Sequence, residues 1–243
     1  MLIKRDKSII PACDVEDMKK LIELIEATHD LEIIGGYKIG ISLILNYGLG
    51  PVVRRIKAFT EKPIIYDHQK AGNDIPEIGD NFAKICKDNG VDAVILFPFV
   101  GPISAERWIE QCQKEELEVI VGGRMTHPGF ETFIPVNTSF IIYETAVVLG
   151  VNNFIIPGTY PGDMKYYRNI IIEKRMEIAL GKKEEISEKV KKFDVFSPGL
   201  ITQGGNITEV GRVAGDRWHA IIGRALYQAS NIRNKTIELS KDL

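Results

Sequence analysis

The sequence has little charge imbalance and little cysteine. Its 243 residues carry 31 lysines or arginines and 33 aspartates or glutamates, a formal net charge of −2. A chain this close to neutrality gives no electrostatic reason to expect nucleic acid or an acidic membrane surface as a partner. The three cysteines, Cys13, Cys86 and Cys112, are odd in number and lack metal-ligand spacing. We therefore expect a reduced, cytoplasmic protein.

Long apolar runs and nucleotide-type glycine turns are also missing. No run reaches membrane-spanning length, and no signal peptide precedes the first strand-like run. No G-x-G-x-x-G turn follows that run, which argues against an open, doubly wound dinucleotide-binding sheet. The composition, 44% hydrophobic and 26% charged, predicts a single domain with a substantial core over residues 1–243.

Short apolar runs alternate with longer amphipathic stretches. The runs are rich in β-branched and aromatic residues, as buried parallel strands are. There are eight of them: Ser8–Cys13, Glu32–Ile39, Pro63–Tyr66, Ala93–Phe99, Glu118–Gly122, Asn153–Ile156, Phe193–Phe196 and His219–Ile222. Helical patterns lie between them, including a long charged one over Arg168–Lys192. The alternation predicts a parallel eight-stranded (β/α)8 TIM barrel, with the open doubly wound sheet as the alternative.

Charged residues gather where the runs end, which in a barrel is the rim that carries function. Asp14 follows the first run and Lys38 lies near the end of the second. Asp67, Lys70 and Asp74 follow the third. Such a cluster on its own fits a solvated surface salt bridge as well as a site, but its place on this rim favours an active site. The neighbouring aspartates are expected to keep each lysine an ammonium, hence an acid and not a Schiff-base nucleophile.

The loops after the seventh and eighth runs have the composition of a phosphate site. They contain Gln203-Gly204-Gly205 and Gly223-Arg224. Glycines let backbone amides approach an anion, arginine can grip phosphate oxygens in a bidentate way, and this is the common phosphate position of the fold. The alternative is an ordinary turn followed by a helix-start cation. An arginine at a helix start opposes the helix dipole, which a bound anion would explain.

Other kinds of chemistry find less support. Ser197 and Thr126 have no histidine in a recognisable triad pattern, and His127 precedes Pro-Gly, which favours a turn. Asp67 and Asp74 could ligate a divalent metal, but the lysines beside them would compete with it, so we predict no metal.

At this point the residues resemble the orotidine 5′-monophosphate decarboxylase family over essentially the whole chain. The likeness lies in six motifs in order: Asp14, Lys38–Gly40, the Asp67…Lys70…Asp74-Ile75-Pro76 cluster, Met125–Gly129, Ser197–Gly199 with Gln203–Gly205, and Ile222–Arg224 with Tyr227. The resemblance implies a cofactor-free decarboxylation of orotidine 5′-monophosphate to UMP in de novo pyrimidine biosynthesis.

The resemblance also implies roles for single residues. Lys70 would protonate C6 of the pyrimidine, Asp67 would face the substrate carboxylate, and Lys38 would orient both. Asp74 and Ile75 would reach into the neighbouring site of a homodimer. The remaining contacts to substrate would come from Asp14 and Lys38 at the ribose, Thr126 at the pyrimidine, and Pro198, Gln203, Gly204, Gly223 and Arg224 toward the phosphate.

The chain departs from the family pattern in the spacing of its charged cluster. The usual Asp-x-Lys-x-x-Asp is here Asp-x-x-Lys-x-x-x-Asp, with each gap one residue longer. On a strict strand one extra residue turns a side chain to the opposite face, so we expect a bulge or turn, tolerated by Gly72 and Asn73. Ile78 stands where many members of the family carry threonine, and Tyr160 stands where some carry arginine.

Two alternatives stay open. One is another phosphosugar decarboxylase of the same barrel, of the 3-keto-L-gulonate 6-phosphate type; that type resembles the chain at the third strand but needs Mg²⁺ and carries glutamate where Lys38 stands. The other is a non-catalytic nucleotide-binding relative, for which the altered spacing is the support.

Overall fold

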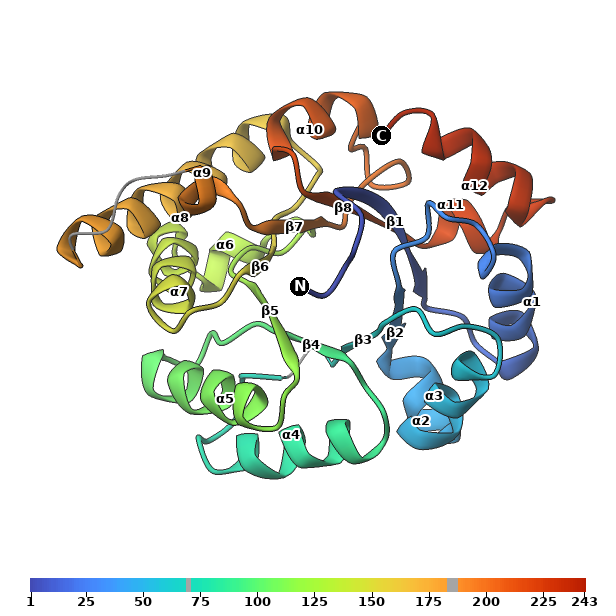
Figure 1. The fold of residues 1–243 in the computed structure, drawn as a ribbon, viewed down its shortest axis with the longest axis horizontal. Coiled ribbons are helices and arrows are strands. Elements are labelled where there is room, and N and C mark those ends of the chain that lie inside the picture. The colour runs from blue at the N-terminus through green and yellow to red at the C-terminus, as the bar shows by residue number, and fades with distance from the viewer. Residues whose placement is uncertain (69–70, 183–187) are drawn as a thin grey trace.

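Eight parallel strands close into a barrel in the computed structural model, which describes residues 1–68, 71–182 and 188–243 (Figure 1). The strands are β1 (Lys7–Cys13), β2 (Tyr37–Gly40), β3 (Ile64–Asp67), β4 (Ala93–Leu96), β5 (Glu118–Gly122), β6 (Asn153–Ile155), β7 (Asp194–Ser197) and β8 (Trp218–Ile222). Each strand pairs with the next in the sequence, and β8 pairs with β1. The predicted TIM barrel is confirmed.

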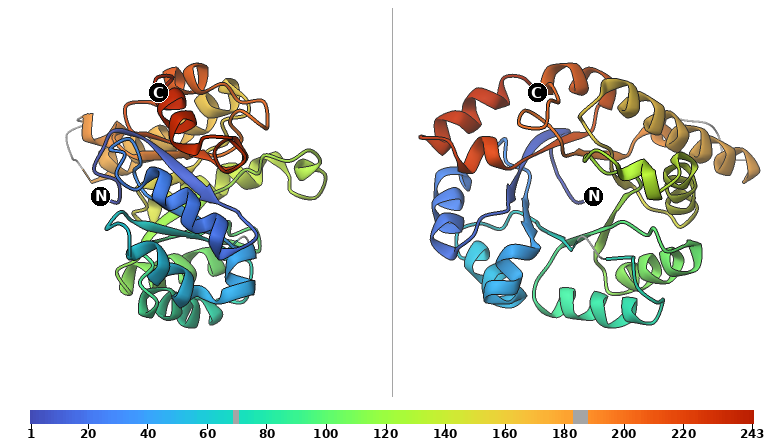
Figure 2. Two further views of the ribbon diagram at one scale, coloured as in Figure 1. Left: turned by 90° about the vertical axis from the view of Figure 1, so that its right-hand side faces the viewer. Right: turned by 180° about the vertical axis from the view of Figure 1, so that it is seen from behind.

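Helices form a ring outside the strands, as the two further views show (Figure 2). They are α1 (Met18–Thr28), α2 (Ile41–Tyr47), α3 (Leu49–Lys57), α4 (Ile78–Asp88), α5 (Pro102–Lys114), α6 (Phe130–Phe133), α7 (Val136–Val148), α8 (Pro161–Gly181), α9 (Glu188–Lys191), α10 (Ile207–Ala214), α11 (Arg224–Tyr227) and α12 (Ile232–Ser240). Polar side chains start several of them: Asp17 accepts from the amide of Lys20 at 2.8 Å, and Asn206 and Asn231 cap α10 and α12 in the same way. None of the helices in the described ranges has both the length and the apolar character to span a bilayer.

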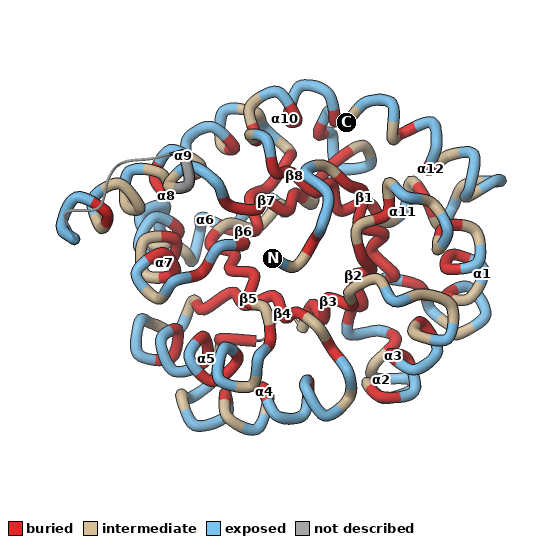
Figure 3. Tube along the Cα trace, viewed as in Figure 1, coloured by how far each residue is buried: buried red, intermediate tan, exposed pale blue. Residues whose placement is uncertain are grey.

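Strand side chains alternate between two cores. Ile10, Ile65, Ile95 and Ile155 belong to an inner cluster that fills the barrel, whereas their strand neighbours pack outward against the helices. The buried strands and the half-exposed helices separate clearly along the chain (Figure 3). Side chains of a strand alternate between the two faces with a period of two residues. Counted from the inner-core residues, Asp14, Lys38 and Asp67 therefore occupy inward positions at the carboxyl ends of β1, β2 and β3.

Three predicted boundaries were wrong. The run Glu32–Ile39 forms a strand only from Tyr37, because Ile34 makes an isolated bridge to Ile9 before the pairing becomes continuous. The run Ala93–Phe99 leaves the sheet after Leu96, where Pro98 has no amide to donate and the amide of Phe99 bonds the carbonyl of Phe97. The long helix begins at Pro161, not at Arg168, and ends at Gly181. Proline suits a first helical turn, since its missing amide proton has no partner there.

Candidate active site

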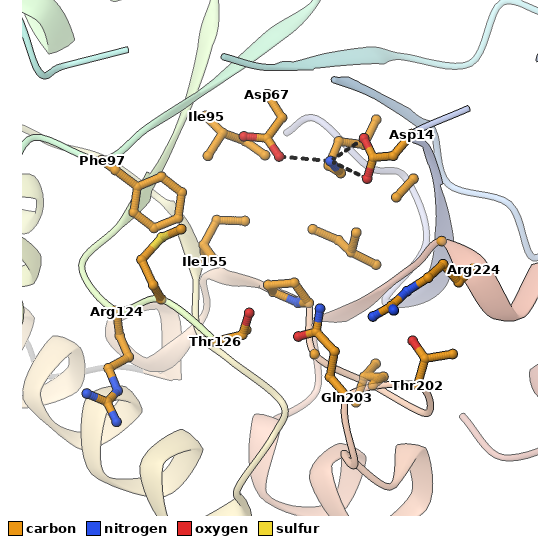
Figure 4. Close-up of a pocket in the computed structure, with 18 of the residues that line it drawn as sticks. Asp14, Asp67, Ile95, Phe97, Arg124, Thr126, Ile155, Thr202, Gln203 and Arg224 are labelled. Carbon is orange, nitrogen blue, oxygen red and sulfur yellow. Dashed lines mark hydrogen bonds and ion pairs between the residues drawn. The ribbon is translucent and has the colours of Figure 1, made fainter. Parts of the chain in front are cut away.

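A cavity of about 180 Å³ opens at the rim where the strands end (Figure 4). Eight of the predicted site residues line it: Asp14, Lys38, Asp67, Thr126, Pro198, Gln203, Gly223 and Arg224. They come from six of the eight strand ends, so the closed barrel unites segments that are more than 200 residues apart. Asp74, Ile75 and Gly204 lie outside this lining.

A chain of three charges occupies one side of the cavity. The ammonium of Lys38 donates to Oδ2 of Asp67 at 2.8 Å and to both carboxylate oxygens of Asp14 at 3.2 Å, as the dashed lines of Figure 4 mark. Lys38 and Asp67 are only 8% and 11% exposed, whereas Asp14 is 46% exposed. The cluster therefore runs from a buried ion pair to a solvent-facing carboxylate.

The balance of forces on Lys38 keeps it charged. Burial alone would lower its pKa, but the negative charges and hydrogen bonds of Asp67 and Asp14 outweigh burial and raise the pKa above its ordinary value. Lys38 is thus a permanent cation at neutral pH, as the sequence predicted for lysines in this cluster. A fixed ammonium can orient the carboxylates beside it without taking part in proton transfer.

The chain turns sharply after β3, as the longer spacing predicted. The amide of Ala71 donates to the carbonyl of His68 at 2.6 Å, and Gly72 follows with φ of +85°, a conformation that favours glycine. Lys70, the predicted proton donor, lies outside the described residues, as does Gln69. Asp67 is the last residue of the strand and faces inward.

Asp74 and Ile75 are held against α5 instead of the cavity. The carbonyl of Asp74 accepts from the hydroxyl of Ser104 at 2.9 Å, and that of Ile75 accepts from the indole of Trp108 at 3.2 Å. The Ile75 side chain is 59% exposed. The side chains of this segment therefore do not line the cavity.

Arg224 and Gln203 lie at the other side of the cavity from the charged cluster (Figure 4). Arg224 forms no ion pair with any residue of the described ranges, and its side chain is exposed at the rim. The amides of Gly204 and Gly205 donate within the loop, to the carbonyls of Ile201 and Gly199. An anion at this end would thus meet the guanidinium of Arg224 and the amide of Gln203 more readily than the Gly-Gly backbone.

Apolar side chains that were not predicted from the sequence also line the cavity. They include Ala12, Ile95, Phe97, Met125, Ile155 and Ile221. Most lie in the inward phase of the two-residue alternation near a strand end, which could have identified them. An apolar lining next to a charged end suits a planar, polar-edged ligand.

Arg124 is a further lining residue that the sequence did not indicate. Its guanidinium pairs with Glu131, lies 3.7 Å from Asp163 and stacks 5.8 Å from the ring centre of Phe130. Figure 4 shows it directed away from the middle of the cavity. It shares with Met125 and Thr126 an adjoining cavity of about 330 Å³ that reaches Tyr160.

Two histidines, His127 and His219, lie apart from the charged cluster. Gly129, with φ of +80°, completes a turn after His127, which is exposed. His219 is fully buried and bonded to Ser8 and Asp194 at the opposite end of the barrel. No group of three or more potential metal ligands of the His, Cys, Asp or Glu type occurs among the residues for which the structure gives a placement.

Comparisons with known proteins agree with this geometry. The orotidine 5′-phosphate decarboxylase / HUMPS family matches residues 7–238. An orotidine 5′-phosphate decarboxylase of Pyrococcus furiosus is 32% identical over 236 residues, 97% of each chain, and one of Methanococcus maripaludis strain S2 is 31% identical over 92% of this chain and 91% of its own.

Solved structures give the same result. The orotidine 5′-monophosphate decarboxylase of Methanocaldococcus jannaschii, complexed with the inhibitor BMP, superposes with a TM-score of 0.80 at 25% identity and covers 98% of both chains. The chain belongs to the orotidine 5′-phosphate decarboxylase / HUMPS family.

Proposed function

We propose that this protein converts orotidine 5′-monophosphate to UMP without metal or cofactor. The observation that carries the proposal is that one cavity has two unlike ends. The Asp14–Lys38–Asp67 cluster lies on one side, and Gln203 lies on the other with Arg224, which has no ion pair among the described residues. A nucleotide monophosphate has matching ends. Its phosphate would bind at Arg224, and its base would reach the cluster across the apolar wall.

Decarboxylation requires that the electron pair left on C6 be stabilised and that a proton be delivered to C6. When the bond between C6 and the carboxylate breaks, carbon dioxide leaves and the electron pair stays on C6. An ammonium donates a proton to that carbon, and we assign this step to Lys70. Asp67, which accepts a hydrogen bond from Lys38 at 2.8 Å, faces the substrate carboxylate, and Lys38 fixes its direction.

The remaining roles concern binding. Asp14 and Lys38 meet the ribose hydroxyls, Thr126 bonds the pyrimidine edge, and Pro198 packs nearby. Gln203, Gly204, Gly223 and Arg224 hold the phosphate. Because the phosphate does not react, its binding energy is available to hold the base in the reacting geometry.

Loss of orotidylate absorbance on addition of the protein, together with UMP titration, tests this function. Lys70→Ala should abolish turnover and keep UMP affinity within a few-fold, because the phosphate end is intact. Near-normal turnover in this variant would show that another group donates the proton. Tight UMP binding by the wild type without decarboxylation would instead favour the non-catalytic relative.

We further propose a homodimer in which Asp74 and Ile75 complete the partner's site. Their anchoring to α5 with an exposed Ile75 supports this, as do Val100 and Ile103, which are 57% and 73% exposed beside the same segment. Mixing Asp67→Asn and Asp74→Asn subunits should restore up to about a quarter of wild-type activity, since half of the dimers are mixed and each has one complete site. No recovery after confirmed subunit exchange would indicate self-contained sites.

A further inference from the structure

The two ends of the segment between Asp67 and Ile75 are tied to one group of aromatic side chains. We call this group the aromatic platform: Tyr66, His68, Phe82 and Trp108. Adjacent ring centres lie 5.1–6.2 Å apart: Tyr66 to His68 5.4 Å, His68 to Phe82 6.0 Å, Tyr66 to Phe82 6.2 Å and Phe82 to Trp108 5.1 Å. The platform lies between the barrel and helices α4 and α5, outside the cavity.

His68 joins the first end of the segment to the platform. Asp67 faces inward, so the next residue continues the alternation and faces outward, toward Tyr66. The hydroxyl of Tyr66 lies 2.6 Å from Nδ1 of His68. Burial raises the pKa of Tyr66 to about 12, so at neutral pH its hydroxyl keeps a proton to donate. An imidazole that accepts at Nδ1 in its neutral form carries its own proton on Nε2.

Trp108 joins the second end to the same platform. Its indole donates to the carbonyl of Ile75 at 3.2 Å, and Ser104 on the same helix donates to the carbonyl of Asp74. Asn73 adds a third tie, because its side-chain oxygen accepts from the amide of Phe99 at 2.9 Å. The segment is therefore fixed at residue 68 and again at residues 73–75.

We propose that His68, held by Tyr66, is a positioning residue for the reaction: it sets the direction in which the chain leaves β3, directly after Asp67. In this chain the cluster contains one more residue in each gap than the usual family spacing. A longer connection has more conformations to lose on ordering, and a fixed side chain at its start removes part of that freedom. The inference rests on the proposed role of Lys70, which follows His68 by two residues.

Substitutions on either side of the bond between Tyr66 and His68 test this role. Tyr66→Phe and His68→Phe keep an aromatic ring and remove the hydrogen bond. We expect each to lower kcat for orotidine 5′-monophosphate by roughly tenfold or more, since small displacements of reacting groups are costly, with UMP affinity nearly unchanged. His68→Asn places an amide oxygen near the former Nδ1 and should recover part of the loss seen in His68→Phe.

Tyr37→Phe is the matched control. Tyr37 precedes Lys38 on β2 as Tyr66 precedes Asp67 on β3, and its hydroxyl bonds Thr28 on α1 at 2.9 Å, away from the segment. It should lose a similar amount of stability and keep kcat. Equal kcat in Tyr66→Phe and Tyr37→Phe would overturn the proposal, as would a parallel loss of kcat and UMP affinity or a failure of His68→Asn to exceed His68→Phe. A Lys70→Ala variant that stays active would instead overturn the assignment of the acid.

Discussion

Lys38 at one end of the barrel and Arg217 at the other are both buried cations that bridge two carboxylates. Lys38 holds Asp14 and Asp67, whereas Arg217 contacts Asp194, Asp6 and, at 2.7 Å, the carbonyl of Ile3. The difference lies in where they lie and what else they bind. Arg217 also donates to the main chain of Ile3, a residue of the inner core, and the N-terminus lies at the centre of the ring of strands (Figure 1). Arg217 and Asp194 border a hollow of about 300 Å³ at this amino end of the barrel, whereas the cluster around Lys38 lines the candidate active-site cavity at the carboxyl end.

The comparison separates two uses of the same interaction. At the amino end of the barrel Arg217 binds two carboxylates and a main-chain carbonyl, and His219 adds bonds to Asp194 at 3.1 Å and Ser8 at 2.8 Å. At the carboxyl end the cluster around Lys38 lines the candidate active-site cavity, and its Asp14 carboxylate is 46% exposed. A buried ion pair beside a ligand cavity can act on that ligand, while one bonded to the main chain and to further side chains of its own fold stabilises the fold. The four predictions below test this distinction.

The largest expected effect is at the carboxyl end of the barrel. Lys38→Met removes the ammonium that Asp14 and Asp67 bind and should lower kcat by about 10²–10³-fold, because a preorganised charge next to the reacting group is lost. Steady-state kinetics and thermal unfolding measured on the same preparation check this. A variant that unfolds easily but keeps kcat would assign Lys38 to stability and would remove the contrast with Arg217.

The ion pairs of Arg217 at the amino end of the barrel should affect stability instead of turnover. Arg217→Met leaves Asp194 buried without a cation and should cost about 3–5 kcal/mol of unfolding free energy, with kcat per folded molecule unchanged. Denaturant unfolding followed by fluorescence gives the free energy, and active-site titration with UMP gives the folded fraction. Replacing Asp194 by Asn in the same chain should restore part of the stability, since the uncompensated charge is then gone.

A smaller effect, on ligand affinity, is expected at the side of the cavity where we place the phosphate. Arg224→Ala removes a charge-assisted donor and should weaken UMP binding by roughly 10–100-fold, with little change in the affinity for the unphosphorylated nucleoside. Isothermal titration with both ligands separates the two affinities. Equal losses for UMP and uridine would place the phosphate elsewhere.

The smallest effect concerns pH. Burial lowers the pKa of His219 below its ordinary value of 6.5, although Asp194 acts in the opposite direction. The unfolded chain then binds a proton that the folded chain resists, so stability is present above pH 6.5 and falls as the pH drops below that value. Lys38, whose pKa is raised, should contribute stability that is lost only in strongly alkaline solution. His219→Gln should reduce the dependence of the unfolding free energy on pH between pH 7 and 5, as measured by denaturant unfolding. An unchanged pH dependence would place the acid-sensitive group elsewhere.

Much of the site could be predicted because barrel topology converts order along the chain into position. Asp14, Lys38 and Asp67 stand at strand ends in the sequence, and closure of the sheet brings them within hydrogen-bonding distance. Arg124 and the aromatic platform were missed, since their partners Glu131, Asp163 and Phe82 lie on helices whose rotation about the barrel no short pattern specifies. The boundaries after Leu96 and before Tyr37 were missed because apolar composition continues where backbone pairing does not.

The sequence by itself determined the barrel, the rim that carries the chemistry, the family and the longer spacing after Asp67. These follow from local periodicity and from residue types at strand ends, which need no knowledge of packing. Only the tertiary structure decided which buried cation lines the candidate active-site cavity and which joins the N-terminal segment to the barrel. It also showed the hydrogen bond from Ala71 to His68 that follows β3. The placement of the two cations depends on contacts between segments distant in sequence, and such contacts form only when the closed sheet sets the distance between them.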